Sequence, residues 1–430
     1  SRVLVRHNGD ISALAFSPDW LWLASGSLDT TARLWRVTDS GAQSIALEGH
    51  LRNVSALAFS PDGHWLATGS YDHTARLWDM KALDPAANPV VLLGHEGIVT
   101  ALAFSPDSRW LATASDDHTA RLWDVTAPNP AANPLILRGH GDAINTLDFS
   151  PSGRWLATGS SDHAVRLWDV QAPDPAANPG ILRGHDDAVF TLAFSPDGRW
   201  LATGGGDSST RFWNMDTAFP AEKPEVLRSH TDEVSIVAFS PNGRWLSTGS
   251  FDGSALLWDL NAANPLANPL LLRTSDAPLN ALTFSSSGHW LATAGGDKTI
   301  WLWDLTAPDP SADPGELRGN ENPVTTLAFG GAPSDNGERW LASGSQDGSV
   351  RLWDLQSNDP NAAPRLLGTD PDHPVVALAF SPDAHWLAAA LLVDGADDGL
   401  ATLETADGHG DDDLAAQGRG KGGGQLGFVS

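Results

Sequence analysis

Short apolar runs alternate with turn signals along most of the chain. Residues 98–139 show the pattern in full, because "IVTALAF" is followed by "SPDS", "RWLATAS" by "DDH", and "TARLWDV" by a phrase rich in alanine and proline before "LILRG". Runs of about 4–7 apolar residues bounded by such turns predict β-strands. Because the four strands follow one another directly, they predict a four-stranded antiparallel sheet.

The predicted strands are apolar on both faces. Val99, Ala101 and Ala103 lie on one face of the first strand, and Leu102 and Phe104 lie on the other. Both faces must therefore be covered, and stacking each sheet between two others achieves this. Closing the stack into a ring also protects the strand edges.

The unit recurs about every 45 residues. A tryptophan in an "LWD"-like triplet marks eight units, at Trp35, Trp78, Trp123, Trp168, Trp213, Trp258, Trp303 and Trp353. A phenylalanine marks the same eight and a ninth, at Phe16, Phe59, Phe104, Phe149, Phe194, Phe239, Phe284, Phe329 and Phe380. The repeat therefore predicts eight complete sheets and a degenerate ninth.

The period, the "GH" before the first strand and the "WD" after the third resemble the WD-repeat (WD40) β-propeller family, and bacterial tandem WD-repeat arrays in particular. The resemblance implies an all-β propeller of four-stranded antiparallel blades over residues 1–390, with eight or nine blades. It also implies that "RVLVR" at residues 2–6 supplies a strand to the ninth blade and locks the ring.

The ninth unit loses the pattern after "HWLAAA". Residues 391–430 are rich in glycine and aspartate and lack a period, so we expect this tail to be disordered. A frameshift is the alternative. "GLATLETA" at residues 399–406 can be encoded by codons that give "ALRLWRL", the missing third strand, one nucleotide along.

Well-formed units carry His, Ser and Asp, the residue types of a hydrolase triad. A catalytic site is built once, whereas these residues recur, so we expect a structural role. In the WD-repeat family they resemble a network that satisfies a buried indole N–H and a carboxylate. The resemblance implies four such sets: His50, Ser70, Asp72 and Trp78; His95, Ser115, Asp117 and Trp123; His140, Ser160, Asp162 and Trp168; and His230, Ser250, Asp252 and Trp258.

Two positions vary freely between otherwise similar units. The first precedes the turn aspartate, at Leu28, Tyr71, Asp116, Ser161, Gly206, Phe251, Gly296 and Gln346. The second follows the first Val, Ile or Leu of the first strand, at Ser12, Ser55, Thr100, Asn145, Phe190, Ser235, Asn280 and Thr325. Both rows resemble the family's contact positions on the top face, although they could also be positions that tolerate any residue. We expect aromatic anchors at Tyr71, Phe190 and Phe251, with polar selectivity from Asp116 and Gln346.

Composition narrows the possible partners. The formal charge of −27 disfavours nucleic acid and anionic membrane surfaces. The absence of cysteine excludes disulfides and thiolate metal sites, and we expect no cofactor and no metal. With no apolar stretch near 18 residues, we expect no transmembrane helix and a cytoplasmic protein.

These features predict a non-catalytic scaffold or sensor module that binds a protein or peptide on the top face of the propeller. A propeller-type enzyme would need a unique cluster of polar groups in its channel, whereas every candidate here recurs in several units. Because Ser1 replaces an initiating methionine and no leader follows it, the chain could also be the C-terminal sensor half of a larger bacterial NTPase or kinase signalling protein.

The frameshift hypothesis predicts the codons of the gene. Resequencing the region that encodes residues 391–430 should reveal codons that yield the third-strand sequence one nucleotide along. An intact reading frame with other synonymous codons would rule out the frameshift.

Overall fold

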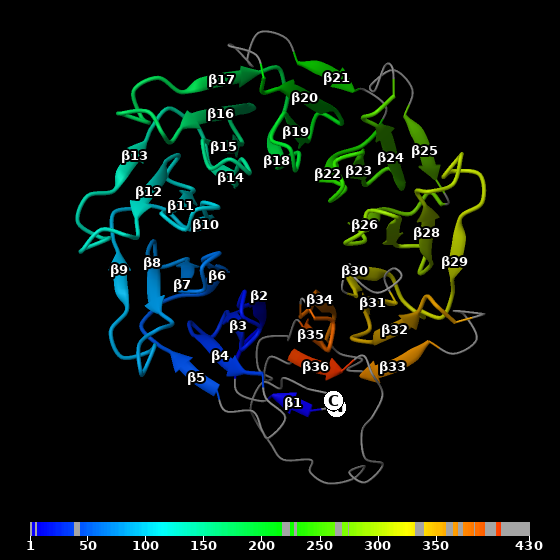
Figure 1. Ribbon diagram of the computed structural model, residues 1–430, viewed down its shortest axis with the longest axis horizontal. Helices are drawn as coiled ribbons and strands as arrows, with labels where there is room; N and C mark the ends of the chain where they lie inside the picture. Colours follow the sequence, from blue (N-terminus) through cyan, green and yellow to red (C-terminus); the bar gives the residue numbers. More distant parts are fainter. Residues whose placement is uncertain are drawn as a thin grey trace.

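Nine four-stranded antiparallel sheets stand around a central channel in the computed structural model (Figure 1). It describes residues 2–4, 7–37, 44–216, 224–227, 230–262, 269–273, 275–331, 339–357, 364–368, 373–381, 383–391 and 401–405. No helix occurs among these residues. The predicted all-β propeller is confirmed, and the ring has nine blades. Blades 1 to 8 each contain four consecutive strands, from β2–β5 to β30–β33, and blade 9 contains β34, β35, β36 and β1.

Each blade places equivalent strands at equivalent depths, from the channel outward. The innermost strands are β2 (Ile11–Phe16), β6 (Val54–Phe59), β10 (Val99–Phe104), β14 (Ile144–Phe149), β18 (Val189–Phe194), β22 (Val234–Phe239), β26 (Leu279–Phe284), β30 (Val324–Gly330) and β34 (Val375–Phe380). The second strands are β3 (Trp22–Ser27), β7 (Trp65–Ser70), β11 (Trp110–Ser115), β15 (Trp155–Ser160), β19 (Trp200–Gly205), β23 (Trp245–Ser250), β27 (Trp290–Gly295), β31 (Trp340–Ser345) and β35 (Trp386–Leu391).

The third strands carry the "LWD"-like triplet in blades 1 to 8. They are β4 (Ala32–Arg36), β8 (Ala75–Asp79), β12 (Ala120–Asp124), β16 (Ala164–Asp169), β20 (Thr210–Asn214), β24 (Ser254–Asp259), β28 (Ile300–Asp304), β32 (Val350–Asp354) and β36 (Ala401–Thr405). The outer strands are β5 (Ser44–Leu47), β9 (Val90–Leu92), β13 (Leu135–Leu137), β17 (Gly180–Arg183), β21 (Glu225–Leu227), β25 (Leu270–Arg273), β29 (Gly315–Leu317), β33 (Arg365–Gly368) and β1 (Arg2–Leu4).

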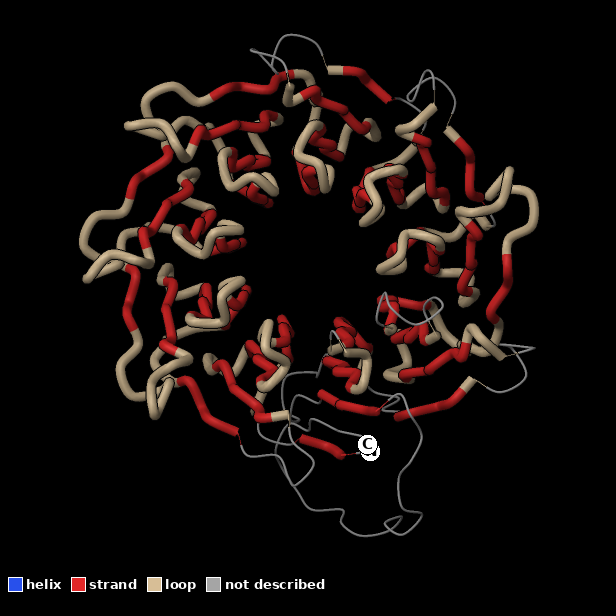
Figure 2. The backbone as a smooth tube through the Cα atoms, in the orientation of Figure 1, coloured by secondary structure: helices blue, strands red, loops and turns tan. Residues whose placement is uncertain are grey.

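The connections define two faces. We call the face where innermost strands begin and second strands end the top face, and the opposite one the bottom face. The "DPAANP" phrases join third strands to outer strands on the bottom face, at the outer edge of the ring (Figure 2). In blade 4 the Asp174 carboxylate accepts a hydrogen bond from the backbone N–H of Ala176 at 3.0 Å, which fixes a tight turn.

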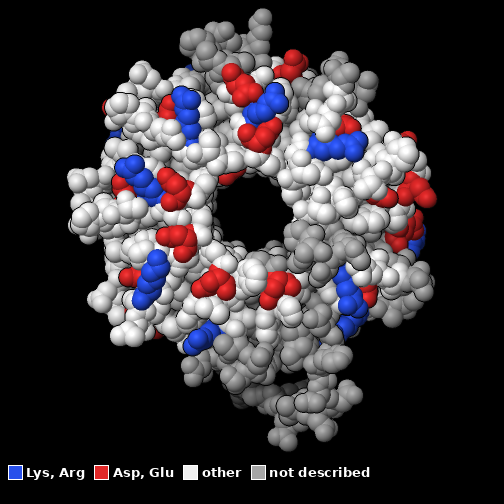
Figure 3. All heavy atoms as spheres, in the orientation of Figure 1, with Lys and Arg blue, Asp and Glu red and all other residues white. Residues whose placement is uncertain are grey.

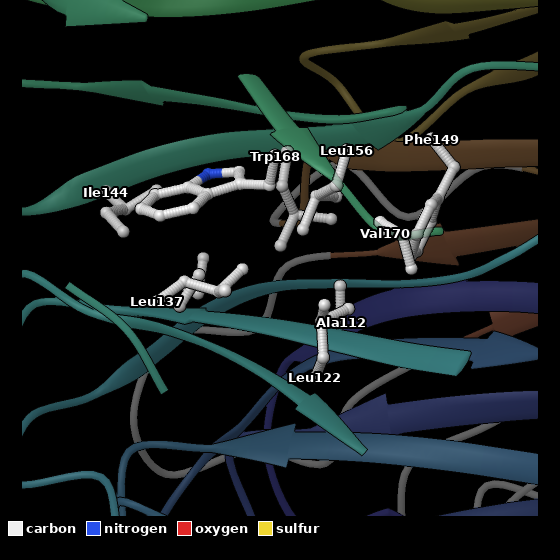
Figure 4. Packing of buried hydrophobic residues seen from close by; sticks show 11 residues of the cluster. Ala112, Leu122, Leu137, Ile144, Phe149, Leu156, Trp168 and Val170 are labelled. Carbon is white, nitrogen blue, oxygen red and sulfur yellow. The ribbon is translucent and has the colours of Figure 1, made fainter. Parts of the chain in front are cut away.

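The apolar core lies between blades rather than within them. Between blades 3 and 4, Trp168 is fully buried and packs in one cluster with Leu122, Leu137 and Ile144 (Figure 4). Each triplet tryptophan of blades 1 to 8 similarly joins a cluster that it shares with the preceding blade. Loss of such a tryptophan costs about 3–5 kcal/mol, because large core side chains leave large cavities.

Blade 9 closes the ring with strands from both ends of the described chain. β1 pairs with β36, as the position of "RVLVR" predicted. We predicted an aperiodic tail from residue 391, yet Ala401–Thr405 form the third strand of this blade, and residues 406–430 lie outside the described residues. Glu404 pairs opposite Leu387 as Trp78 pairs opposite Leu66, so it holds the register position of the triplet tryptophan.

A β-bulge occurs near the start of every innermost strand. In blade 3, Val99 pairs with Ser115 and Ala101 pairs with Ala114, so Thr100 has no partner in the ladder. The same shift occurs in the other eight blades. A bulge changes the direction of the side chain it carries. The bulged residues are those of the second variable row.

Candidate interaction surface

A hydrogen-bonded network joins the strands of blade 2 at the top of the sheet. Asp72 Oδ2 lies 3.0 Å from His50 Nδ1, and Thr68 Oγ1 lies 2.8 Å from His50 Nε2. The Trp78 indole donates to the same Thr68 hydroxyl at 3.0 Å. Because the ionised carboxylate can only accept, Nδ1 donates to it and Nε2 accepts from Thr68. The second and third strands of the blade, the turn between them and the loop before the blade are thereby tied together.

The hydroxyl of this network is not the serine that we predicted. Ser70 Oγ instead donates to the Arg52 carbonyl and accepts from the Asp72 N–H, both at 3.0 Å. Both hydroxyls point to the same face of β7, but Ser70 lies two residues further along, at the turn. Threonine likewise replaces the predicted Ser115, Ser160 and Ser250, at Thr113, Thr158 and Thr248.

The sequence did contain the signal for threonine. A Thr or Ser stands ten residues before the triplet tryptophan in each of the first eight units, at Ser25, Thr68, Thr113, Thr158, Thr203, Thr248, Thr293 and Ser343. The predicted serine position is glycine in blade 5, at Gly205, where His185 and Trp213 nevertheless meet at Thr203.

The structure brings most members of the predicted sets together. His95 contacts Asp117 and Thr113, and Trp123 donates to Thr113. The same contacts join His140, Asp162 and Trp168 through Thr158. Blade 6 differs, because His230 reaches Asp252 and Thr248 but the buried Trp258 indole has no partner among the described residues.

Burial sets the charge state of the network. It holds the pKa of His50 below its usual value, although Asp72 opposes the shift. Burial also acts to raise the pKa of Asp72, but hydrogen bonds from Thr74, the Leu51 N–H and His50 outweigh it and lower the pKa to about 2. At neutral pH the imidazole is therefore neutral and the carboxylate ionised. Thr68 is fully buried, so its hydroxyl cannot reach a substrate.

Side chains of the second variable row form hydrogen bonds between neighbouring blades. Ser55 donates to the Val99 carbonyl of blade 3 at 2.7 Å, and Thr100 donates to the Ile144 carbonyl of blade 4 at 2.6 Å. The same bond runs from Asn145 to Val189, from Asn280 to Val324, from Ser12 to Val54 and from Thr325 to Val375. These six residues therefore have a structural role between blades, which their interpretation as contact positions did not include. The bulge aims their side chains at the neighbouring blade.

Two residues of this row do not make the bond. Phe190 cannot make it, and its ring is 43% exposed at the top of β18. The Ser235 hydroxyl is buried and has no partner among the described residues. Blade 5 has therefore replaced an interblade hydrogen bond with an exposed aromatic ring.

The other candidate contact residues lie on the turns between second and third strands. Tyr71 is 41% exposed in blade 2 and Phe251 is 42% exposed in blade 6, while Asp116 in blade 3 and Gln346 in blade 8 are exposed. All share the top face with Phe190. Blades 5 and 6 are neighbours, whereas blade 2 lies across the channel (Figure 1). The candidates thus line one rim without forming a single compact patch.

The bottom face carries paired charges. Arg109 lies 3.1 Å from the Asp124 carboxylate and covers the Trp110 ring, with 4.9 Å between the guanidinium carbon and the ring centroid. Similar pairs recur around the ring, and further acidic side chains lie at the channel mouth (Figure 3). A pocket of about 490 Å³ opens beside Arg109 and Pro173. The Arg–Asp pairs of blades 3, 4, 6 and 8 therefore neutralise part of the charge on this face, while the acidic side chains at the channel mouth keep the mouth negative.

Comparison of the sequence with models of known protein families shows to which family the chain belongs. The model of the WD domain, G-beta repeat (WD40), matches the chain nine times, at residues 1–36, 41–79, 88–124, 133–169, 178–214, 222–259, 270–304, 314–354 and 364–402. The chain belongs to the WD40 family. Propellers of the WD40 family are generally protein-interaction scaffolds and are typically non-catalytic. A search of curated proteins gives no match to the chain.

Two further observations concern the described residues alone. They contain no group of three or more His, Asp or Glu side chains that could hold a metal ion. They also contain no helix long and apolar enough to cross a membrane.

The assignment of the network hydroxyl predicts unequal effects for two neighbouring substitutions. Thr68→Val leaves Nε2 of His50 and the indole N–H of Trp78 buried without a partner, which costs about 1–3 kcal/mol. Ser70→Ala should cost less, because blades 5 and 7 already have glycine at that place. Urea unfolding and amide hydrogen exchange in blade 2 measure both effects. A larger loss of stability for Ser70→Ala would contradict the assignment.

Proposed function

We propose that the chain is a non-catalytic scaffold or sensor module that binds a protein or peptide on its top face through Tyr71, Phe190 and Phe251. Asp116 and Gln346 add polar selectivity. The single observation that carries this proposal is Phe190. In six blades the equivalent residue stabilises the ring by a hydrogen bond to the next blade, worth about 1 kcal/mol. An exposed ring in that place fits a contact with a partner better than a role in the frame.

The turn residues support the same face. Tyr71 and Phe251 expose large rings where other blades carry Ser161, Gly206 or Gly296, so the fold does not require an aromatic residue there. Exposed aromatic residues are the usual anchors of protein interfaces. The formal charge of −27 argues against nucleic acid or anionic membrane as the partner.

The proposal predicts that three substitutions abolish capture of the partner. Tyr71→Ala, Phe190→Ala and Phe251→Ala together remove the proposed anchors while leaving the buried core intact. Affinity capture from a lysate of the source organism, followed by quantitative mass spectrometry, should show proteins held by the wild type and lost from the triple variant.

A matched control removes three exposed apolar side chains from other surfaces. Leu83→Ala, Leu271→Ala and Leu366→Ala alter residues that are exposed on the bottom-face connection of blade 2 and on two outer strands. This variant should keep the captured proteins. Circular dichroism confirms that both variants fold. If the anchor variant captures the same proteins as the wild type, the proposed function is wrong.

A further inference from the structure

On the top face of blade 5, an aromatic ring and a carboxylate lie against the same glycine. A Cβ atom added to Gly206 would lie 3.3 Å from Cε2 of Phe190 and 3.2 Å from Oδ2 of Asp187. The edge of the aromatic ring and the carboxylate therefore flank the same point of the backbone. We call Asp187, Phe190 and Gly206 the blade 5 niche. Asp187 and Phe190 are both exposed.

The ring and the carboxylate approach the backbone this closely because Gly206 has no side chain, since a Cβ atom would lie only 3.1 Å from Cγ of Asp187 and 3.3 Å from Cε2 of Phe190. The equivalent positions of blades 2, 3 and 6 carry residues with side chains, Tyr71, Asp116 and Phe251. Blade 7 also has a glycine here, Gly296, but a Cβ atom there would meet the side chains of Ala277 and Pro278. Among the described blades with glycine at this place, blade 5 is thus the one that pairs a ring with a carboxylate.

A ring beside a carboxylate binds a cation. The aromatic face attracts positive charge, and the carboxylate adds a charge-assisted hydrogen bond. Asp187 Oδ1 already accepts from the backbone N–H of Ala188 at 2.7 Å, which holds the carboxylate in place and leaves Oδ2 toward Gly206. An arginine guanidinium or lysine ammonium matches these groups in both charge and size.

The loops around the niche are acidic on balance, although the exposed Arg138 and Arg183 stand just before two of them and His118 lies 3.9 Å from Asp142. The loops that lead into the innermost strands of blades 3 to 6 contain acidic side chains and no Lys or Arg, at residues 95–98, 140–143, 185–188 and 230–233. Their exposed acids include Glu96, Asp142 and Asp232. The nearest turns of these blades, at 116–118, 161–163, 206–208 and 251–253, also contain no Lys or Arg. A cationic partner segment would meet attraction along this arc and not at the niche alone.

We propose that the partner presents a basic segment, and that one of its Arg or Lys side chains binds in the blade 5 niche. This inference rests on the proposed function, because it specifies the chemistry of a partner that binds the top face. Tyr71 and Phe251 would then contact apolar side chains elsewhere on that partner.

The test is selection of binders from a random peptide library displayed on phage, with the immobilised wild-type protein as bait. Enriched peptides are synthesised, and their affinities are measured by fluorescence polarisation. We expect the enriched peptides to be rich in Arg and Lys. Phe190→Leu keeps the apolar bulk but removes the π face, and Asp187→Asn keeps the shape but removes the charge. Each should weaken binding roughly tenfold.

Two further variants sharpen the test. Gly206→Gln introduces the residue of blade 8 against the ring and the carboxylate, so it should displace both and weaken binding as strongly without removing either group. Glu225→Gln removes an exposed acid from the outer strand of the same blade and should leave the affinity unchanged.

The outcomes separate this inference from the proposed function. Enriched peptides without basic residues that still lose binding in the Tyr71, Phe190 and Phe251 alanine variant would overturn the cationic partner and leave top-face binding in place. Enriched peptides that bind this triple variant like the wild type, or no enrichment at all, would count against both.

Discussion

The ring depends on one constraint, which is that each sheet is apolar on both faces and is buried by its neighbours. The triplet tryptophan is the largest side chain that buries these faces, because it inserts into the core shared with the preceding blade. Leaving its indole N–H without a partner in that core costs free energy, and seven of the eight tryptophans donate to a Thr or Ser hydroxyl. In blade 2 Thr68 accepts this hydrogen bond and donates to a neutral histidine, which in turn donates to an ionised aspartate, and Thr113 and Thr158 do the same in blades 3 and 4. The conserved appearance of the units within this chain follows from that requirement.

The sequence predicts most of this architecture because its signals are periodic. Strands, turns, nine units and the closing strand from residues 2–6 all follow from positions that repeat. Thr68 was missed because it and Ser70 are both hydroxyls on one face of a strand, and spacing alone does not decide which of them the histidine reaches. The strand in Ala401–Thr405 was missed because its sequence lacks the tryptophan, although backbone pairing with β1 and β35 holds it in register.

The β-bulge in the innermost strands was the least predictable feature. It also has the largest effect on which residues are assigned to the contact surface. Because the residue type varies between units at the second variable row, these positions seemed to have no structural role. Ser, Thr and Asn vary there because each can donate one hydrogen bond to the next blade, and the bulge turns each of them toward it. Phe190 differs from the other residues of this row because its side chain cannot donate the interblade hydrogen bond. The candidate contact surface is thus defined by departures from the repeat, and no unit considered alone would have revealed it.

The central claim is that Phe190 exchanges an interblade bond for exposure to a partner. The thermal unfolding midpoint of Phe190→Ser tests it most directly, because the serine can donate to the Val234 carbonyl as Ser55 donates to Val99. We predict a midpoint above that of the wild type, in keeping with one added hydrogen bond of about 1 kcal/mol. A midpoint below that of the wild type would show that the ring of Phe190 stabilises the fold itself, and would contradict the account.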